Sequence, residues 1–365
     1  MLNGQHGSLS AQLGERIRLV IQAEDGWLPF DRFMAMSLYE PGLGYYAHHS
    51  RKFGAMPSSG SDFVTAPEMS PLFGRTLAVQ LAQALQACDT TALWEFGAGS
   101  GALAVQLLHA LGGRVKAYHI VELSASLRAR QADALAPWGG LVTWHDRLPV
   151  QFEGVVVGNE LLDAMPVQLL RWSGTQWQER GVVNRGGDFA WQDRPTDLRP
   201  PLQADFEAGT VVELHAQAHA FVRTLAEHLA RGAAFFIDYG FPEAEYYHPQ
   251  RIGGTLMCHR AHRVDADPLR DVGLKDITAH VDFSGIALAA QDAGMTVLGY
   301  TSQARFLINC GLVDALKAAD LRTSSAALRL VNEHEMGELF KVIGLVRGPP
   351  FDAIGFASGD RSHRL

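Results

Sequence analysis

The sequence predicts an α/β fold: a mostly parallel, Rossmann-like sheet with an antiparallel C-terminal strand, a helical region before it and an inserted β-meander. Three observations predict this fold. From residue 93 onward, short apolar segments alternate with helical patterns, which is typical of βαβ units. Glycines cluster directly after the first of these segments, where a strand would turn into its helix. The last predicted elements run helix, strand, helices, strand, which suits a sheet closed by an antiparallel strand.

Composition and charge narrow the class of protein further. The chain has 365 residues, 47% hydrophobic and 19% charged, which is typical of a globular protein with one large domain or two ordinary ones. A net charge of -8, from 31 basic and 39 acidic side chains, argues against non-specific nucleic-acid binding. Three scattered cysteines, Cys88, Cys258 and Cys310, indicate a reducing compartment without a disulfide framework.

The sequence also bears on where the protein resides. No apolar run reaches the roughly 18–20 residues that are needed to cross a bilayer. The first residues lack the apolar core of a signal peptide and carry Glu15 and Glu24, which are foreign to acid-poor transit peptides. We therefore expect a cytoplasmic protein with no membrane span.

Residues 1–90 are predicted to form a helical region with a long loop, which covers the active site. Two rows of apolar residues recur at helical spacing in this region. They are Leu9, Leu13, Ile17 and Val20 in the first helix, and Phe73, Leu77, Leu81 and Leu85 in the last. The intervening segment, 39–63, is rich in turn formers and aromatic residues, and long ordered loops in compact domains are usually functional.

Residues 91–348 are predicted to form one large catalytic domain with two insertions, followed by a flexible tail over 349–365. Its strands are predicted at 92–96, 115–121, 141–145, 154–158, 233–238, 295–300 and 340–347. Its helices are predicted at 101–111, 124–136, 213–231 and 284–293, with further helices up to about 335. The insertions are an antiparallel meander at about 166–206 and a loop-like stretch at 239–281.

The glycine loop after the first parallel strand predicts a nucleotide-like ligand. Glycines there allow close approach of the backbone, and the helix N-terminus attracts an anionic group. Read as Gly97-x-Gly99-x-x-Ala102, the loop fits a dinucleotide fingerprint. Read as Glu95-x-Gly97-x-Gly99-x-Gly101, it is the acidic glycine loop of class I S-adenosylmethionine (SAM) enzymes. A purely structural tight turn is the third interpretation, and the loop alone does not decide.

Two further acids follow the next two predicted strands. Glu122 lies about 20 residues beyond the glycine loop, where an acid can bind ribose hydroxyls. The alternative for Glu122 is a helix-start acid beside Ser124, which the helix dipole would favour. Asp146 lies at the ligand edge of the same sheet or is a simple turn acid.

The end of the fourth strand favours a methyltransferase over a dehydrogenase. The apolar run 155–158 leads directly into Asn159, Glu160 and Asp163, ahead of Pro166. Methyltransferases place a polar or acidic cluster at this strand end to hold the methyl acceptor. A dehydrogenase has no obvious use for it, so an NAD-dependent oxidoreductase remains only as the alternative.

Four sequence blocks, in order, carry a resemblance to one family. They are Phe33-Met34 with 39–46 and 62–68, then 95–101, then 159–166, and lastly Asp238-Tyr239-Gly240-Phe241 leading to Asp-Ile-Thr-Ala-His-Val-Asp-Phe at 276–283. Together they resemble the MidA family, the bacterial and mitochondrial relatives of the complex I assembly-factor methyltransferase. The resemblance spans about 30–347, and the last block is the most specific. The sequence departs from the pattern around Met257–His262, where an aromatic residue is expected after the histidine.

The resemblance implies a class I SAM-dependent methyltransferase with SAM as cofactor and S-adenosylhomocysteine as product. Mitochondrial members of the family are associated with symmetric dimethylation of an arginine on a complex I subunit. The expected partner is therefore an arginine-bearing protein, a respiratory-chain subunit included, and a homodimer is a further expectation. A non-catalytic SAM-binding assembly or chaperone factor remains the alternative outside enzymology.

An arginine acceptor would require a carboxylate. A guanidinium is planar and permanently charged, and a carboxylate can take two of its donors and hold one nitrogen toward the methyl group. Glu160 is the first choice for that role, Asp163 is its helper or a helix-stabilising acid, and Glu213 is a weaker candidate.

The last block adds two catalytic candidates. His280 could accept a proton, since its ordinary pKa of about 6.5 suits that task, or could be a satisfied core histidine. Asp282 could rim the cleft or cap the helix that follows. Tyr45 and Tyr46 could bind a cation through their rings or pack the loop.

The complete set of predicted site residues has three groups and no metal site. Cys258, His259 and His262 lack the second paired ligand cluster that a closed zinc site needs. The catalytic candidates are Glu160, Asp163, His280 and Asp282. The cofactor-binding candidates are Glu95, Gly97, Ala98, Gly99, Gly101, Glu122, Asp146 and Asn159. The substrate-binding candidates are Tyr45, Tyr46, Asp62, Asp238 and Tyr239.

Overall fold

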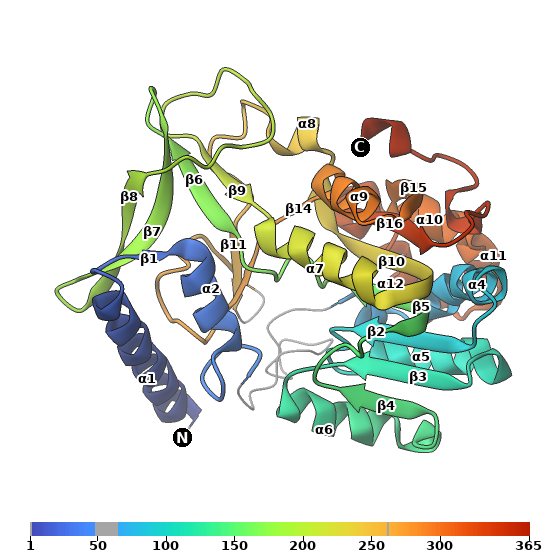
Figure 1. Cartoon of the computed structure of the whole chain (residues 1–365). Helices are drawn as coiled ribbons and strands as arrows, with labels where there is room; N and C mark the ends of the chain where they lie inside the picture. Colours follow the sequence, from blue (N-terminus) through green and yellow to red (C-terminus); the bar gives the residue numbers. More distant parts are fainter. Residues whose placement is uncertain (1, 48–64, 261–262) are drawn as a thin grey trace.

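A computed structural model describes residues 2–47, 65–260 and 263–365 and shows two lobes that face each other (Figure 1). The larger lobe is built on an eight-stranded sheet with the order β15-β16-β10-β5-β2-β3-β4, to which β14 adds beside β10. Only β16 runs antiparallel to its two neighbours. The predicted Rossmann-like sheet with an antiparallel C-terminal strand is therefore confirmed. Its strands are β2 (Ala92–Phe96), β3 (Ala117–Val121), β4 (Val142–His145), β5 (Phe152–Asn159), β10 (Leu229–Phe241), β14 (Val281–Asp282), β15 (Thr296–Ser302) and β16 (Phe340–Arg347).

Helices cover both faces of this sheet because its central strands are apolar on both sides. Val155 and Val157 belong to the core on one face, and Val156 belongs to the core on the other. The first face packs against α5 and against α4, which carries the buried row from Phe73 to Leu85. The second face packs against α7 and α9. The helices of this lobe are α3 (Ala66–Met69), α4 (Leu72–Ala87), α5 (Ala102–Leu111), α6 (Ala125–Ala134), α7 (Ala216–His228), α8 (Glu243–Tyr246), α9 (Phe283–Asp292), α10 (Gln303–Asn309), α11 (Leu312–Ala318) and α12 (Leu321–Leu328).

The smaller lobe, called the cap lobe below, joins the N-terminal helices to the two insertions. The predicted meander forms an antiparallel sheet with the order β1-β7-β6-β9, and β8 pairs with β7. Leu13 of α1 and Phe33 of α2 are fully buried in one cluster with Val182 of β7. The N-terminal helices therefore stay folded by packing on the meander. Its elements are α1 (Leu2–Ala23), β1 (Leu28–Pro29), α2 (Phe30–Tyr39), β6 (Gln168–Trp172), β7 (Trp177–Arg185), β8 (Asp188–Pro195) and β9 (Val211–Leu214).

The second insertion is not the loop that the sequence suggested. Strands β12, β11 and β13 form a three-stranded sheet in that order, which also belongs to the cap lobe. Ile277 and Cys258 are buried in the same cluster as α1 and α2. The strands span only three or four residues, too few for a periodic pattern to be recognised. They are β11 (Met257–Arg260), β12 (Arg263–Asp265) and β13 (Asp276–Thr278).

Two other local predictions are corrected. The helix expected over 213–231 is shorter and corresponds to α7 alone. Strand β9 comes before it, and strand β10 begins at Leu229, which pairs with Phe152 of β5. The tail at 349–365 is packed rather than flexible. Phe356 is only 6% exposed and fills the space left by Gly299 and Gly344, where an added Cβ would collide with its ring. In the described part of the chain, no helix combines the length and apolar character needed to cross a membrane.

Candidate active site

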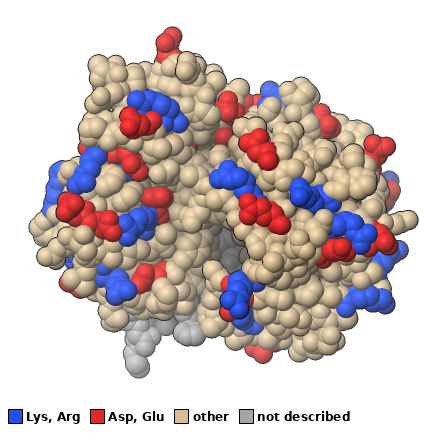
Figure 2. Space-filling model, in the orientation of Figure 1, with Lys and Arg blue, Asp and Glu red and all other residues tan. Residues whose placement is uncertain are grey.

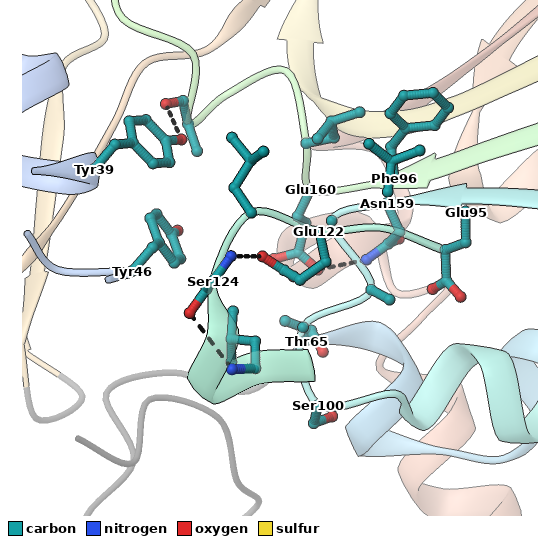
Figure 3. A pocket seen from close by; sticks show the side chains of 18 of the residues that line it. Tyr39, Tyr46, Thr65, Glu95, Phe96, Ser100, Glu122, Ser124, Asn159 and Glu160 are labelled. Carbon is teal, nitrogen blue, oxygen red and sulfur yellow. Dashed lines mark hydrogen bonds between the residues drawn. The ribbon is translucent and has the colours of Figure 1, made fainter. Parts of the chain in front are cut away.

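A cavity of about 800 Å³ lies between the carboxyl ends of β2, β3 and β5 and the cap lobe. This is where open α/β sheets usually bind ligands. The molecular surface is hollowed between the two lobes on the face shown in Figure 2. The sheet contributes one wall through the glycine loop and the residues after β3 and β5. The cap lobe contributes the opposite wall, and Figure 3 shows Tyr39 and Tyr46 there, away from Ser100 and Glu95.

The glycine loop has the backbone conformation that a ligand cradle requires. Gly97, Gly99 and Gly101 all lie in the left-handed region, with φ of 66°, 54° and 83°. Side chains disfavour that region, and a Cβ on Gly97 would come within 3.2 Å of Leu161. The loop opens the N-terminus of α5 toward the cavity, and its residues 97–100 line the wall. Gly101 does not line the wall but allows the turn into the helix.

Glu95, near the end of β2, lines the cavity close to the glycine loop. Its side chain is 2% exposed, and the Tyr118 hydroxyl donates a 2.5 Å hydrogen bond to its Oε2. Burial raises the pKa of Glu95 to about 7, despite that hydrogen bond. The carboxylate therefore faces the glycine loop in a site of low polarity. A cation bound in this site would lower the pKa of Glu95 and favour its ionised form.

Glu122 is held in place by two donors at the end of β3. Its Oε1 accepts from the Ser124 N–H at 2.9 Å, and its Oε2 accepts from Gln131 Nε2 at 3.2 Å. The same Gln131 Nε2 donates to the Gly99 carbonyl at 3.1 Å, while Trp144 donates to Gln131 Oε1 at 3.0 Å. Gln131 is fully buried on α6 and thus couples the predicted ribose-binding acid to the glycine loop. Sequence reasoning missed it, because a single glutamine in a helix carries no signal.

Glu160 has a strained backbone directly after β5. Its φ is 51°, a left-handed value that non-glycine residues adopt at a cost of roughly 1–2 kcal/mol, as is common at functional sites. Asn159 Nδ2 donates to Glu160 Oε1 at 3.0 Å. Burial, and then the nearby Asp238 carboxylate, raise the pKa of Glu160 to about 8, although hydrogen bonds from Asn159 and the Ala66 backbone favour its charged form. The side chains of Asn159 and Glu160 both face the cavity (Figure 3).

Asp163 lines the cavity beside Glu160, whereas Asp238 supports the loop from below. Asp238 Oδ2 accepts from the backbone N–H groups of Leu161, Leu162 and Asp163 at 3.0, 2.8 and 3.3 Å. Asp238, predicted to bind substrate, therefore fixes the loop through its carboxylate and is not among the residues that line the cavity. Burial raises the pKa of Asp163 well above its ordinary value, and the Asp238 and Glu160 carboxylates raise it further.

The cap lobe presents a pair of stacked tyrosines to the cavity. The rings of Tyr39 and Tyr46 lie 5.6 Å apart at an interplanar angle of 18° (Figure 3). The Tyr39 hydroxyl donates to the Ala164 carbonyl at 2.8 Å, and the Tyr46 hydroxyl donates to Asp276 Oδ2 at 2.9 Å. Tyr45, predicted to bind substrate, is instead 1% exposed and packs edge-on against Tyr46.

The three-stranded sheet supplies side chains that sequence reasoning did not assign. His259, Asp276 and Thr278 of β11 and β13 line the cavity. Asp276 lies in the most specific block of the sequence, which was the signal available for finding it. Tyr239 also lines the cavity, as predicted for a substrate-binding residue, and its ring stacks on His280 at 5.8 Å.

Several other predicted residues lie away from the cavity. His280 sits behind Tyr239 and does not line the cavity, and burial lowers its pKa to about 4, which favours the neutral imidazole. Asp282 caps α9 by accepting from the N–H groups of Ser284 and Gly285, which is its structural alternative. Asp146 is exposed and does not line the cavity. Asp62 lies outside the described residues.

The lysine, arginine, aspartate and glutamate side chains among the described lining residues are all acidic. Five of the described lining residues carry carboxyl groups, and none is lysine or arginine. The five are Glu95, Glu122, Glu160, Asp163 and Asp276. Glu213, the weaker acidic candidate, is buried elsewhere and accepts from the Thr255 N–H at 2.7 Å. The cavity is therefore suited to a cationic ligand.

Comparisons with known proteins agree with this arrangement. A family model of S-adenosyl-L-methionine-dependent methyltransferases matches residues 76–301. The crystal structure of a COG1565 superfamily member from Burkholderia thailandensis, bound to S-adenosyl-homocysteine, is 50% identical. It covers 99% of this chain and 98% of its own, with a TM-score of 0.96. A native crystal structure from the same organism is 49% identical, with the same coverage and a TM-score of 0.91.

Curated relatives are more distant but span most of the chain. The protein arginine methyltransferase NDUFAF7, mitochondrial, of Danio rerio is 28% identical over 363 residues, which is 86% of this chain and 82% of that protein. The Caenorhabditis elegans homolog of the same name is 25% identical over 78% of this chain and 73% of its own.

Proposed function

Since this chain belongs to the family of S-adenosyl-L-methionine-dependent methyltransferases, we propose that its methyl acceptor is an arginine side chain of a protein. The methyltransferase class and the SAM cofactor follow from the family and from the near-identical fold of the S-adenosyl-homocysteine-bound relative. The dehydrogenase alternative is thereby set aside. The arginine acceptor is the step beyond, and the relatives named protein arginine methyltransferases support it.

The residues of the sheet wall fit SAM. Gly97 and Gly99, both in the left-handed region, line the cavity without a side chain, and the N-terminus of α5 attracts the carboxylate of an amino-acid moiety. Glu122 is fixed so that its carboxylate can hold ribose hydroxyls. We assign Glu95, Gly97, Ala98, Gly99, Glu122 and Asn159 to cofactor binding on this basis.

The residues after β5 would orient the acceptor. Bound SAM supplies an electrophilic methyl group, so the contribution of the chain is chiefly alignment. Glu160 and Asp163 can each accept N–H donors of a guanidinium and hold one of its nitrogens in line. Methylation of a guanidinium nitrogen releases a proton. The pKa of Glu160 is about 8 without ligand, and a bound guanidinium would lower it and ionise the carboxyl, which could then receive that proton.

One observation carries the proposal: the loop after β5 places two buried acids, Glu160 and Asp163, on a wall whose described lining residues include no lysine or arginine. Burial raises the pKa values of Glu160 and Asp163, and repulsion from neighbouring carboxylates, that of Asp238 first, raises them further. A guanidinium, which stays charged at any physiological pH, would relieve this repulsion. A neutral hydroxyl or thiol acceptor would not.

The test is to find the methylated residue. Extract from cells lacking this protein is incubated with isotopically labelled SAM and the purified chain, and the hydrolysed proteins are examined by mass spectrometry. We expect labelled methylarginine with the wild type and with Glu227→Gln, an exposed control on α7. Glu160→Gln should give none.

Two outcomes would reject the proposal. Label on another type of residue would exclude arginine as the acceptor. Full rescue of a deletion strain by Glu160→Gln would favour the non-catalytic assembly factor.

A further inference from the structure

We infer that the Thr65 hydroxyl binds the carboxylate of the amino-acid moiety of SAM, and that Gln106 of α5 holds Thr65 in place for this contact. The inference concerns the cofactor of the family and is independent of the arginine acceptor. It assigns a role to a segment that precedes the sheet in the sequence, residues 65–67, of which Thr65 and Pro67 line the cavity.

A carboxylate bound against the described wall of this cavity depends on uncharged donors. The described lining residues include five acids and no lysine or arginine. On this wall the carboxylate of SAM must therefore be held by N–H and O–H groups. Such hydrogen bonds to a charged acceptor are about twice as strong as those between neutral groups, so a single hydroxyl has a measurable effect on affinity.

Few hydroxyl groups on the wall are available for this task. Seven of the described lining residues carry a hydroxyl group. Those already engaged by the protein are Tyr39, Tyr46 and Ser124. Of the others, Tyr239 belongs to β10, which β5 separates from β2, and Thr278 belongs to the cap lobe. Thr65 and Ser100 are left, and Ser100 is part of the glycine loop.

The Thr65 hydroxyl is not used by its own helix. Thr65 is the N-cap residue of α3, and its φ of -85° and ψ of 162° are typical of that position. A threonine there normally accepts a hydrogen bond from a backbone N–H of the first turn. The Thr65 side chain makes no such bond, and it has no hydrogen-bond partner among the described residues. Its hydroxyl is therefore available to a ligand in the cavity that it lines.

Gln106 fixes this segment to the helix that follows the glycine loop. Its Nε2 donates to the Pro67 carbonyl at 2.6 Å, and its Oε1 accepts from the Gly74 N–H at 2.8 Å. Gln106 lies one turn after Ala102, the first residue of α5, which itself lines the cavity. A Cβ on Gly74 would come within 2.5 Å of the Gln106 Cβ, so the glycine allows this close packing. The position of Thr65 relative to the start of α5 is thus set by Gln106.

Thr65 also lies where the chemistry of SAM requires a carboxylate site. A short carbon chain joins the carboxylate to the sulfonium, so the carboxylate must bind near the reacting methyl group. In the view of Figure 3, Thr65 lies between Ser100 of the glycine loop and Glu160 after β5. The backbone of Ala66 also hydrogen-bonds the Glu160 carboxyl group. The segment 65–67 therefore lies at the junction of the loops that follow β2 and β5, at the ligand-binding edge of the sheet.

A purely structural role of Thr65 makes a different prediction. If its side chain only fills space on the wall, Thr65→Val should affect all ligands of the cavity alike, because valine has nearly the same shape. If the hydroxyl binds the carboxylate, Thr65→Val should weaken only ligands that carry a carboxylate. Thr65→Ser, which keeps the hydroxyl, should not weaken them.

The experiment is calorimetry of the full-length chain with two ligands. One is S-adenosylhomocysteine, and the other is its decarboxylated analogue, which keeps the nucleoside, the sulfur and the amine. Thr65→Val should weaken S-adenosylhomocysteine binding by about tenfold or more and change binding of the analogue by less than about twofold. Thr65→Ser should bind both ligands like the wild type.

Gln106→Met tests the positioning role. Methionine keeps the length of the side chain but cannot donate to the Pro67 carbonyl. We expect S-adenosylhomocysteine binding to weaken by about threefold to tenfold, with binding of the analogue unchanged. In the Thr65→Val background the same change should have no further effect, because both residues act through one contact.

Two matched controls make the same chemical changes elsewhere. Thr296→Val replaces an exposed threonine at the start of β15, and Gln291→Met replaces an exposed glutamine on α9. Both should bind the two ligands like the wild type.

The outcomes separate the parts of this inference. Unchanged S-adenosylhomocysteine binding in Thr65→Val would exclude the hydroxyl contact. An equal loss of both ligands would overturn it as well, and Thr65→Ala decides by the same comparison if Thr65→Val does not fold. Losses that add in the double variant would reject the role of Gln106 alone. A wild type that binds neither ligand would overturn the inference together with the SAM cofactor, whereas the identity of the methyl acceptor affects none of these measurements.

Discussion

Glu160→Gln should stabilise the unliganded protein while it abolishes methyl transfer, and both effects have one cause. The carboxyl group of Glu160 is buried beside Asp238. Burial and the charge of Asp238 together raise its pKa from 4.5 to about 8. Its backbone also adopts a left-handed conformation with φ of 51°. A residue held in this way lowers the stability of the folded protein without ligand, as is common for residues that bind one. Glutamine keeps the shape and the hydrogen bond from Asn159 but removes the charge.

The sign and size follow from proton linkage. Because the folded-state pKa is above the unfolded value, the unfolded chain loses this proton first as the pH rises. The wild type should therefore lose stability between about pH 4.5 and pH 8, and Glu160→Gln should not. The shift sets a ceiling of about 5 kcal/mol. Water in the cavity screens part of it, and Asp163 and Asp238 share the repulsion, so we expect about 1–2 kcal/mol.

Thermal unfolding at several pH values checks this reasoning. For a chain of this length, about 1–2 kcal/mol corresponds to a rise in Tm of roughly 1–3 °C. The rise should be present at about pH 8.5 and nearly absent at about pH 4.5, without ligand. Glu227→Gln, on the exposed face of α7, should show neither. A Glu160→Gln variant that is less stable than the wild type at high pH, or a Tm difference independent of pH, would refute the argument.

Three further predictions concern the residues around the site. Gly99→Val should abolish S-adenosylhomocysteine binding in calorimetry, because a β-branched residue is strongly strained at φ of 54°, and retained affinity would exclude this loop as the cradle. Gln131→Leu should weaken the same binding about tenfold with the fold intact by circular dichroism, because Glu122 and the Gly99 carbonyl both lose a donor. Unchanged affinity would mean that Gln131 only packs. Asp282→Ala should lower the unfolding free energy by about 1 kcal/mol through the lost helix cap and leave kcat unchanged, and a large drop in kcat would return this residue to the catalytic group.

The parts that sequence reasoning predicted correctly are governed by local patterns. The run Val155–Val157 had to be a strand buried on both faces, because its apolar residues do not alternate. The glycine loop and Asn159-Glu160 could be placed at one edge, since the carboxyl ends of parallel strands meet there. The order of these motifs, with the family blocks, was enough for the sheet, the family and the cofactor.

The parts that it missed depend on contacts between distant segments. His280 and Asp282 stand in the most specific block, yet the structure places one behind Tyr239 and the other at a helix cap, while Asp276 of the same block lines the cavity. Gln131 gave no signal at all. Periodicity shows which residues are buried but does not show which buried residue faces a cavity.

The sequence by itself therefore determined the cofactor side of this protein, because that side is built from consecutive strand ends whose spacing is fixed by the βαβ repeat. The wall of the cavity that the cap lobe contributes was decided only by tertiary structure. Tyr46 and Asp276, joined by a 2.9 Å hydrogen bond, are 230 positions apart. They meet because α2 and the three-stranded sheet share one apolar core, and no local pattern encodes which segments will share a core.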